Sequence, residues 1–555
     1  MSTATRERPA LAQSNGRAGA LAGTGTMLRF MLRRDRIRFP AWVLGLTLMT
    51  AYFANAIGTV MDHEALEGMV AFSNNPIMGL IGGPGYGFDD ITVPRFLAGM
   101  YAAYLMLGAA LMGITTISRH TRVEEQTGRA ELIRANVVGR HSQLAAALII
   151  AVVMSVLSSV FMGLAVYGSV IDPQPDANGS FLFGFSVGAI GLVFAGVAAV
   201  TMQLSAFSRA ASGIAGAVLG VTFVVRGLGD MAAVTDGDLD WLSWLSPLGW
   251  AQQTAPFTLD RWWPLTLCVG LTAVLVVAGF ALQSRRDLNA GMLADRLGSA
   301  VAPGWLRSPL TLAFRLQRAS LIGWSVAMLL AGVVFGAFVE PMRDAADDMP
   351  EEITGLMGGA DEIVEGYVGF MGIYMAIMIS VFAILSVQSL RGEESGFRTE
   401  PVLAASVSRT GWLLSWTVVT AVGVLWLLFL AGLGTGVAAG AAVGDWDLFG
   451  PVLLGHVVHA APVWMLLAVA VAMYGLMPRL VGFPWLVLVY SMVVTMFGPM
   501  LELEQGVQNT SVFDHVGQHP AEDIGWAAVG ILTVIAVAGI AIGVAAFRRR
   551  DLVTA

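Results

Sequence analysis

The sequence contains Arg122-Val-Glu124-Glu125-Gln-Thr-Gly128-Arg129-Ala-Glu131-Leu-Ile-Arg-Ala135 and, 269 positions later, Arg391-Gly-Glu393-Glu394-Ser-Gly396-Phe-Arg398-Thr-Glu400-Pro-Val-Leu-Ala404. Aligned without a gap, the two copies share an arginine, a Glu-Glu pair, a second arginine, a third glutamate and an alanine. The next arginines, Arg140 and Arg409, also coincide. A charged segment present in duplicate predicts two equivalent surfaces outside the membrane.

The composition indicates a membrane protein. The 555 residues are 56% hydrophobic and only 13% charged, with a mean hydropathy of +0.71,. Apolar runs of about 20 residues, enough to cross a bilayer as a helix, recur along the chain. They predict an all-α polytopic protein with about twelve spans, near residues 40–60, 96–117, 143–169, 181–206, 211–229, 263–283, 319–339, 367–389, 411–441, 448–477, 482–500 and 525–547.

The arginines predict the orientation. The chain has 31 basic residues, all of them arginine, and on this span map only Arg95, Arg226, Arg261 and Arg343 lie on the side opposite the N-terminus. The positive-inside rule then places both termini in the cytoplasm of a multi-pass plasma-membrane protein. Residues 1–26 are polar and lack an apolar core, so we expect a disordered tail rather than a signal peptide,.

Other features recur in the same order and indicate a tandem duplication. They are the arginine-rich stretches 28–34 and 312–318, the glycine-rich segments 79–83 and 355–359, and Arg-Arg-Asp-Leu at 285–288 and 549–552. We predict a first six-span half at 27–288, a cytoplasmic linker at 289–311 and a second six-span half at 312–555. An even number of spans gives both halves the same orientation.

Two absences limit the chemistry. A P-loop needs a lysine for the nucleotide phosphates, and the chain has none, so it lacks a standard ATPase site,. The one cysteine, Cys268, lies in a predicted span and allows no internal disulfide or thiolate cluster,. We therefore expect a transport subunit rather than an enzyme, with no metal site. The uniform use of arginine is also consistent with a GC-rich genome.

The repeated segment is predicted to form short helices. Glu125 and Arg129 are spaced i,i+4, as are Glu394 and Arg398, an order that stabilises a helix by about 0.2–0.5 kcal/mol,. A charged helix on the membrane surface would offer a solvated face to a partner protein. The alternative is a plain cytosolic loop, but the positive-inside rule accounts for the arginines and not for the repeated glutamates.

These motifs resemble the membrane subunit of type-2 ATP-binding-cassette (ABC) exporters, and in particular the fused twelve-span actinobacterial permeases described as tetronasin or polyketide-antibiotic exporters. The resemblance covers the chain after about residue 28. It rests on the two Glu-Glu segments, on the terminal Arg-Arg-Arg-Asp-Leu and on Trp241-Leu-Ser-Trp-Leu-Ser-Pro247-Leu-Gly249-Trp250-Ala-Gln252-Gln253. It implies an ATP-driven exporter that moves hydrophobic or amphiphilic, drug-like compounds outward.

The resemblance also implies the partners. The segment between the second and third spans would be the coupling helix that docks on the ATPase. The residues concerned would be Arg122, Glu124, Glu125, Gly128, Arg129 and Glu131, with Arg391, Glu393, Glu394, Gly396, Arg398 and Glu400 in the second half. Two copies of a separate ABC ATPase would carry the ATP and Mg²⁺, and this chain would hold no cofactor. We expect contacts with membrane lipid and none with nucleic acid. Because the glycines differ by one position, the two docking sites need not be equivalent.

Polar groups inside the predicted spans are candidates for the substrate pathway, because their burial is costly. They are Gln203, Arg226, His456 and His459, joined by Trp250 in the tryptophan-rich segment 230–262. Arg226 also has the position of a residue that extends its charge to the membrane surface. The histidines, spaced i,i+3, suit helix packing better than a metal site, since no carboxylate or cysteine lies near them in the sequence. Segment 230–262 is either a pair of short re-entrant helices or an interfacial loop.

Two other functions fit parts of the sequence. A proton-coupled secondary transporter also has twelve spans in parallel halves, but it usually needs carboxylates inside the membrane, and the predicted spans hold acids only at their ends,. A polytopic glycosyltransferase would use acids of the first outer loop, where Asp89 and Asp90 lie. Neither alternative accounts for the repeated charged segment.

Overall fold

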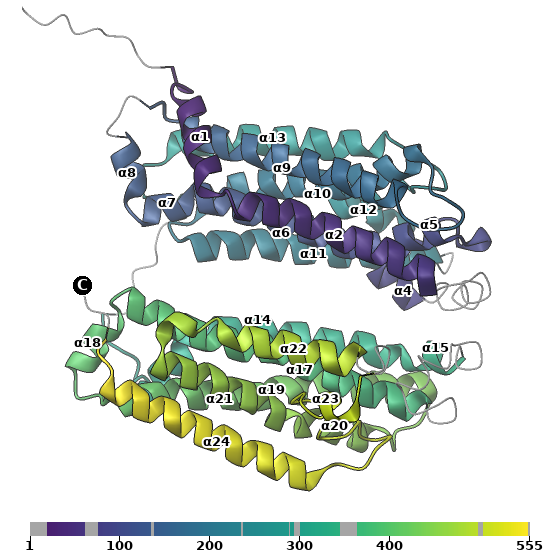
Figure 1. The fold of residues 1–555 in the computed structure, drawn as a ribbon. Helices are drawn as coiled ribbons and strands as arrows, with labels where there is room; N and C mark the ends of the chain where they lie inside the picture. Colours follow the sequence, from purple (N-terminus) through teal and green to yellow (C-terminus); the bar gives the residue numbers. More distant parts are fainter. Residues whose placement is uncertain are drawn as a thin grey trace, which may run out of the picture. The chain divides into compact units, whose positions relative to one another are not determined.

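The computed structural model describes residues 19–60, 76–134, 138–234, 237–287, 289–293, 300–344, 363–497 and 503–552. Every regular element in these ranges is a helix, and the chain divides into two compact units, Met1–Leu297 and Gly298–Ala555 (Figure 1). Within these ranges, eleven helices are long and apolar enough to span a membrane, or twelve when one bent pair counts as a span. The predicted all-α polytopic fold is therefore confirmed.

Some sequence predictions fall elsewhere. Most of the N-terminal tail and the whole glycine-rich segment 355–359 lie outside the described residues. The cytoplasmic position of the two termini stays a prediction, because it depends on the arginine distribution alone.

The first unit is a bundle around α10. Of the apolar 18-residue stretch of α10 that could span the membrane, 83% is buried inside the protein. Helices α6, α9 and α13 pack directly on it. Its elements are α1 (Thr24–Arg34), α2 (Arg38–Val60), α4 (Pro76–Ile81), η1 (Phe88–Asp90), α5 (Val93–Phe96), η2 (Leu97–Tyr101), α6 (Ala102–His120), α7 (Arg122–Gln126), α8 (Arg129–Arg134), α9 (Ser142–Tyr167), α10 (Ala177–Leu204), α11 (Ser208–Val234), η3 (Asp240–Leu245), α12 (Pro247–Gln252) and α13 (Pro264–Arg285).

The second unit has a similar plan, in which α14, α17 and α19 are long and the helix that follows them is divided into α20 and α21. Helix α21 packs against α24 and α17, and α14 pairs with α19 along its length. Its elements are α14 (Pro309–Ala337), α15 (Val339–Asp344), α17 (Ile363–Ser395), α18 (Thr399–Ala404), α19 (Arg409–Val443), α20 (Phe449–Val458), α21 (Ala460–Leu476), η6 (Pro478–Leu480), α22 (Phe483–Phe497), α23 (Gln505–Gln508) and α24 (Trp526–Arg549).

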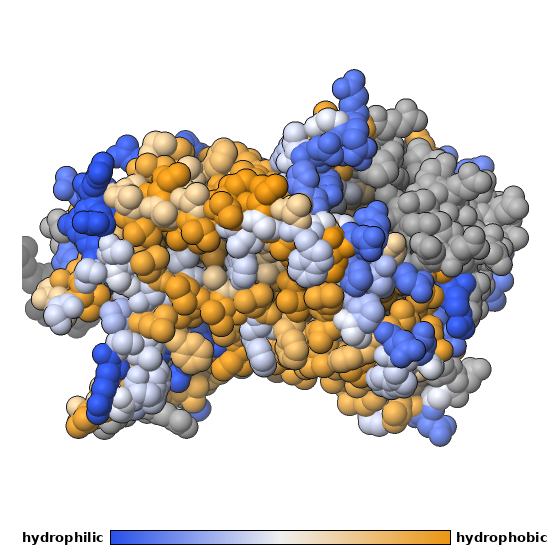
Figure 2. Space-filling model, turned by 90° about the horizontal axis from the view of Figure 1, so that it is seen from below, coloured by the Kyte–Doolittle hydropathy of each residue, from blue (hydrophilic) through white to orange (hydrophobic). Residues whose placement is uncertain are grey.

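Small residues allow the helices to approach closely. A Cβ added to Gly113 of α6 would lie 2.4 Å from the carbonyl oxygen of Gly191 on α10, and one added to Gly332 of α14 would lie 2.3 Å from that of Ala431 on α19. In lipid, helices gain little from the hydrophobic effect and associate through such backbone contacts. Outward-facing positions are apolar, as on α24, and hydrophobic side chains cover the middle of the face seen in Figure 2 while hydrophilic ones gather toward its ends.

The halves differ where the chain enters its first span. Helices α1 and α2 meet at a 66° bend. Pro40 near the start of α2 has no N–H to donate, so the helical hydrogen-bond ladder is interrupted there,. In the register that pairs 28–34 with 312–318, the counterpart of Pro40 is Trp324, and α14 runs unbroken from Pro309. The stretch 312–318 is thus continuous with the seventh spanning helix, whereas 28–34 belongs to the separate helix α1.

Candidate functional site

The second glutamate of each repeated segment is buried and forms a bidentate ion pair with an arginine. Arg286 donates from its two terminal nitrogens to the two oxygens of Glu125, at 2.7 and 2.9 Å. Arg550 donates in the same way to Glu394, at 2.7 and 2.6 Å. Both arginines belong to the repeated Arg-Arg-Asp-Leu motifs. Each pair therefore ties the end of the second span of its half to the end of the sixth, and we call the two pairs the forks.

Further polar groups complete each fork. Arg286 also donates from Nε to the Gln203 side chain at 2.6 Å, and Glu125 accepts a 2.8 Å hydrogen bond from Arg122. In the second half, the Tyr474 hydroxyl donates to Glu394 at 2.6 Å, and the guanidinium of Arg550 stacks on the rings of Tyr474 and Phe547. Two-pronged charge-assisted hydrogen bonds are among the stronger polar contacts in proteins. Gln203, predicted to face a substrate pathway, instead belongs to this cluster.

The second arginine of each segment pairs with the first glutamate and not, as predicted, with the second. Arg129 lies 3.6 Å from Glu124, and Arg398 contacts Glu393 at 2.7 Å. Both spacings are i,i+5, so the predicted i,i+4 pairs are wrong, because a turn rather than continuous helix separates the partners. Hydrogen bonding to Glu393 raises the pKa of Arg398, which stays protonated. Glu124 is also buried and pairs with Arg34 at the end of α1.

Both turns require a left-handed residue at the same aligned position. Gly128 has φ 72° and Phe397 has φ 58°. Glycine adopts this conformation without a steric cost, whereas for other residues it costs roughly 1–2 kcal/mol. The glycine of the second copy, Gly396, lies one residue earlier. Strained backbone conformations at non-glycine residues occur most often at functional sites.

The two turns are the exposed parts of the repeated segments. We name residues 126–129 turn A and residues 395–398 turn B. Gln126, Thr127 and Arg129 are exposed in turn A, and every residue of turn B is exposed, including the large apolar Phe397. By contrast, four predicted docking residues are buried: Arg122, Glu124, Glu125 and Glu394. The prediction of one solvated charged helix is therefore wrong for these four, because burial in the forks and beside α1 takes them out of solvent.

The remaining predicted docking residues lie around the turns. Glu131 is exposed and accepts a hydrogen bond from Asn289 at 2.8 Å. Arg391 and Glu400 are half-buried. Arg122 and Arg391 have the same aligned position but different surroundings: α6 breaks at Thr121 before Arg122, whereas α17 continues through Arg391 without interruption.

Arg226 is fully buried and caps a short helix at the opposite end of the first unit. Its guanidinium donates to the carbonyls of Leu80, Ile81 and Gly82 at 2.9–3.1 Å, and it pairs with Asp230 at 3.3 Å. These carbonyls end α4, where helical acceptors lack partners and positive charge is favourable. The interpretation of Arg226 as a residue reaching to the membrane surface is wrong, because it holds a loop in place.

The tryptophan-rich segment forms two short helices, η3 and α12, rather than a plain loop. The Trp250 indole donates to the carbonyl of Trp244 at 2.6 Å, and Trp244 stacks on Trp263 with ring centres 5.5 Å apart. Gly249 is required there, since an added Cβ would lie 1.9 Å from the Ser243 carbonyl oxygen. Trp250 thus fixes this segment.

The two histidines do not share one continuous helix. The helix breaks at His459, between α20 and α21, because Pro462 cannot donate to the carbonyl of Val458,. Each Nδ1 bonds the carbonyl four residues earlier, and each Nε2 is buried without a hydrogen-bond partner among the described residues. Within the same residues, no group of three or more His, Cys, Asp or Glu side chains is placed to hold a metal.

Sequence reasoning missed Arg286, Arg550 and Tyr474 as members of the site. The two arginines were visible only as a repeated motif. Their recurrence after the sixth span of each half was the available signal, and their contact with the glutamates required the folded bundle.

Comparison with known proteins identifies related permeases. The family model for the C-terminal domain of the multidrug efflux system permease Rv1217c matches residues 25–282 and 306–548, one segment in each half. The multidrug efflux system permease protein Rv1217c of Mycobacterium tuberculosis (strain ATCC 25618 / H37Rv) is 35% identical over 99% of this chain and 98% of its own length.

The chain belongs to this efflux permease family. It is accordingly a multi-pass membrane protein and a transport subunit, in agreement with the predicted resemblance. The matched segments include Glu125 and Glu394 of the forks, whereas Arg286 and Arg550 lie four and two residues beyond the ends of the first and second segments.

We expect Glu394→Gln to destabilise the protein by about 3–5 kcal/mol, because it leaves the guanidinium of Arg550, whose side chain is only 13% exposed, without its counter-charge,. Glu393→Gln is the matched control, since it removes a neighbouring pair whose arginine is solvent-exposed and should cost no more than about 1 kcal/mol,. Unfolding of the detergent-solubilised protein measures both. Equal losses in the two variants would contradict a structural role specific to the fork.

We expect Phe397→Gly to be more stable than Phe397→Ala by about 1 kcal/mol, because only glycine relieves the left-handed strain while both variants lose the same aromatic ring. At the neighbouring Ser395, which is helical, the order should reverse, with alanine favoured over glycine,. Thermal unfolding of the four variants is the measurement. A Phe397→Ala variant as stable as Phe397→Gly would argue against strain at this position.

We expect Arg226→Gln to accelerate hydrogen exchange at the amides of residues 78–83, because the last carbonyls of α4 lose their donor. Arg261→Gln removes the same charge from the partly exposed segment before α13 and should leave these amides unchanged. Equal protection in wild type and Arg226→Gln would show that the cap is dispensable.

Proposed function

We propose that this chain is the membrane subunit of an ATP-driven ABC exporter that moves hydrophobic or amphiphilic, drug-like compounds outward. Membership of the multidrug efflux permease family supports the substrate class. The chain has no lysine for a P-loop, so ATP and Mg²⁺ would be held by a separate ATPase,.

One observation carries the docking part of the proposal: turns A and B occupy matching aligned positions, are exposed, and are each held by a buried fork. An exposed turn with a fixed backbone loses little conformational entropy when a partner binds it. Two such turns fit two copies of an ATPase. The docking surfaces would be the turns themselves, not the full set of charged residues.

The forks supply a route for coupling. Force applied at turn B reaches α17 directly and reaches α24 through the pair of Glu394 and Arg550. Turn A is linked in the same way to α7 and, through Arg286, to the end of α13. Movement of a docked ATPase would therefore displace two spanning helices of each half together, as mechanical coupling requires.

The two docking contacts would differ in chemistry. Turn B presents Phe397, whereas the aligned residue of turn A is Gly128. An aromatic side chain is a frequent anchor in protein interfaces. We therefore propose that turn B binds its ATPase through Phe397 and Arg398, and that turn A relies on polar contacts through Gln126 and Arg129.

The structure gives less support to a proton-coupled transporter or a glycosyltransferase. Asp230, a buried acid inside a span, is already paired with Arg226 and hydrogen-bonded by Ser243 at 2.5 Å, which does not favour proton coupling. Asp90, a candidate for glycosyl transfer, contacts Arg95 at 2.7 Å within its own exposed loop, next to exposed Asp89.

The test is assembly with the ABC ATPase encoded nearest to this chain. We expect the double variant Arg129→Glu plus Arg398→Glu to lose most co-purified ATPase and substrate-stimulated ATP hydrolysis, because both exposed charges of the turns are reversed. Its unfolding temperature is measured alongside. Loss of the Arg398–Glu393 pair should cost at most about 1 kcal/mol because Arg398 is solvent-exposed, and the buried Glu124 keeps its second partner, Arg34, when Arg129 is replaced,.

Arg307→Glu plus Arg36→Glu is the matched control, because it reverses two exposed arginines outside the turns. It should retain the ATPase. Loss of the complex in both double variants would indicate a general charge effect, and retention in both would refute docking at the turns. Phe397→Ala alone should weaken, but not abolish, association.

A further inference from the structure

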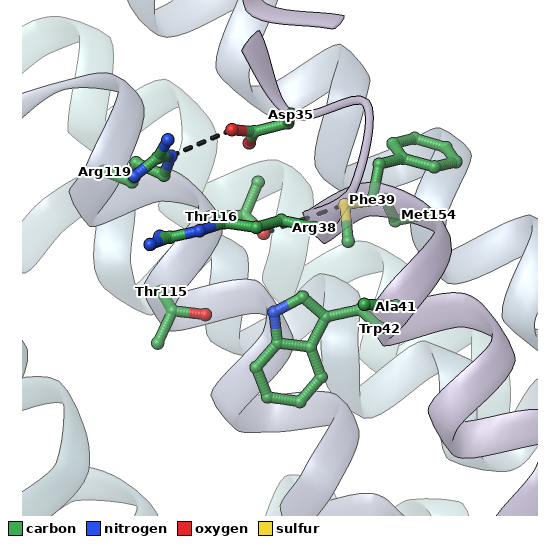
Figure 3. Close-up of a pocket in the computed structure, with 9 residues that line it drawn as sticks. All are labelled: Asp35, Arg38, Phe39, Ala41, Trp42, Thr115, Thr116, Arg119 and Met154. Atoms are coloured by element: carbon green, nitrogen blue, oxygen red, sulfur yellow. Dashed lines mark hydrogen bonds and ion pairs between the residues drawn. The ribbon is translucent and has the colours of Figure 1, made fainter. Parts of the chain in front are cut away.

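A pocket with two arginines and a carboxylate in a largely apolar lining opens at the bend between α1 and α2. It has a volume of about 410 Å³ and is lined by residues of the bend, of α2, of α6 and of α9: Asp35, Arg38, Phe39, Ala41, Trp42, Thr115, Thr116, Arg119 and Met154 (Figure 3). None of these residues belongs to the forks or to the turns. We call it the elbow pocket.

The elbow pocket has an excess of positive charge and of unused donors. Asp35 is neutralised by Arg119, whose Nε donates to it at 2.9 Å, and is also bonded to His120 at 2.6 Å. Arg38 has no hydrogen bond or ion pair among the described residues, and neither do the terminal nitrogens of Arg119 or the indole N–H of Trp42. Figure 3 shows the two guanidinium groups extending to the same side of the pocket.

The surroundings of the pocket match a lipid. Exposed apolar residues continue from it along the same helices, with Leu48 and Met49 on α2 and Leu111 one turn before Thr115 on α6. Trp42 is half-buried, as is usual for tryptophan at the level of lipid headgroups,. A ligand with an anionic headgroup and an apolar tail would pair with the arginines of the pocket and cover the exposed apolar residues of α2 and α6.

The second half serves as an internal comparison. In the register that pairs 28–34 with 312–318, Ala319 and Ile322 take the places of Asp35 and Arg38, and Val326 takes that of Trp42. In the register of the charged segments, Gln388 replaces Arg119. Ile322 and Val326 are exposed on the unbroken α14. Among the described residues at these aligned positions, the charged groups of the pocket and the bend thus occur in the first half alone, and duplication of the fold does not account for them.

We propose that the elbow pocket binds the headgroup of one anionic phospholipid from the arginine-rich side of the membrane. Arg38 and the free nitrogens of Arg119 would contact the phosphate, the Trp42 N–H would donate to a headgroup oxygen, and the acyl chains would lie along α2 and α6. Arginine suits phosphate because it presents several donors in a fixed plane. The proposal does not depend on the ATPase partner.

The test is native mass spectrometry of the full chain in detergent, titrated with phosphatidylglycerol or with phosphatidylcholine. Wild type should retain one phosphatidylglycerol more tightly than any phosphatidylcholine. Arg38→Gln should weaken this binding about fivefold, the effect of losing one basic residue near an anionic headgroup. Trp42→Phe, which keeps the packing and removes the N–H, should cause a smaller loss and serves if Arg38→Gln folds poorly.

Arg36→Gln is the matched control, because Arg36 is exposed two residues away and does not line the pocket. It should leave phosphatidylglycerol binding unchanged. Equal losses in Arg36→Gln and Arg38→Gln, or equal retention of the two lipids, would overturn the proposal. Displacement of the lipid by millimolar inorganic phosphate would identify a free-anion site instead and would also refute it.

Discussion

A buried carboxylate must be paired, and in this protein that requirement shapes the arginine-rich end of each half. Glu125 and Glu394 lie at the end of the second span of their halves. Each accepts hydrogen bonds from both terminal nitrogens of an arginine that follows the sixth span. Desolvating such a pair is costly, so it stabilises only when geometry and surrounding hydrogen bonds are good. Gln203 in one half and Tyr474 in the other supply those additional bonds.

The two halves differ in their charged turns and at the start of their first spanning helices. The left-handed position of the charged turn is glycine in the first half and phenylalanine in the second, which makes one exposed turn polar and the other partly aromatic. The entry to the first span is bent and cationic, whereas α14 is straight and apolar at the aligned positions. Both differences lie at surfaces, outside the buried cores of the two bundles.

Much of the architecture was predictable because lipid imposes simple rules. Apolar runs of sufficient length predicted the spans, and the structure confirms them to within a few residues at most ends,. Errors arose where polar residues meet inside the fold. The predicted i,i+4 pairs require a continuous helix where the structure has a turn. The position of Arg226 in the sequence also fits a residue at the membrane surface, whereas the structure buries it, and the helix expected to carry both histidines breaks at His459.

Hydropathy and repetition along the chain are enough to predict the membrane class, the tandem halves and the location of the charged segments, because both are properties of the residues in order,. Tertiary structure alone decided which charges are buried and which are exposed. Glu124 and Glu125 carry the same charge as Glu131, yet only Glu131 is exposed. Burial depends on Arg34 and Arg286, which are distant in sequence and meet these glutamates only when the helices pack.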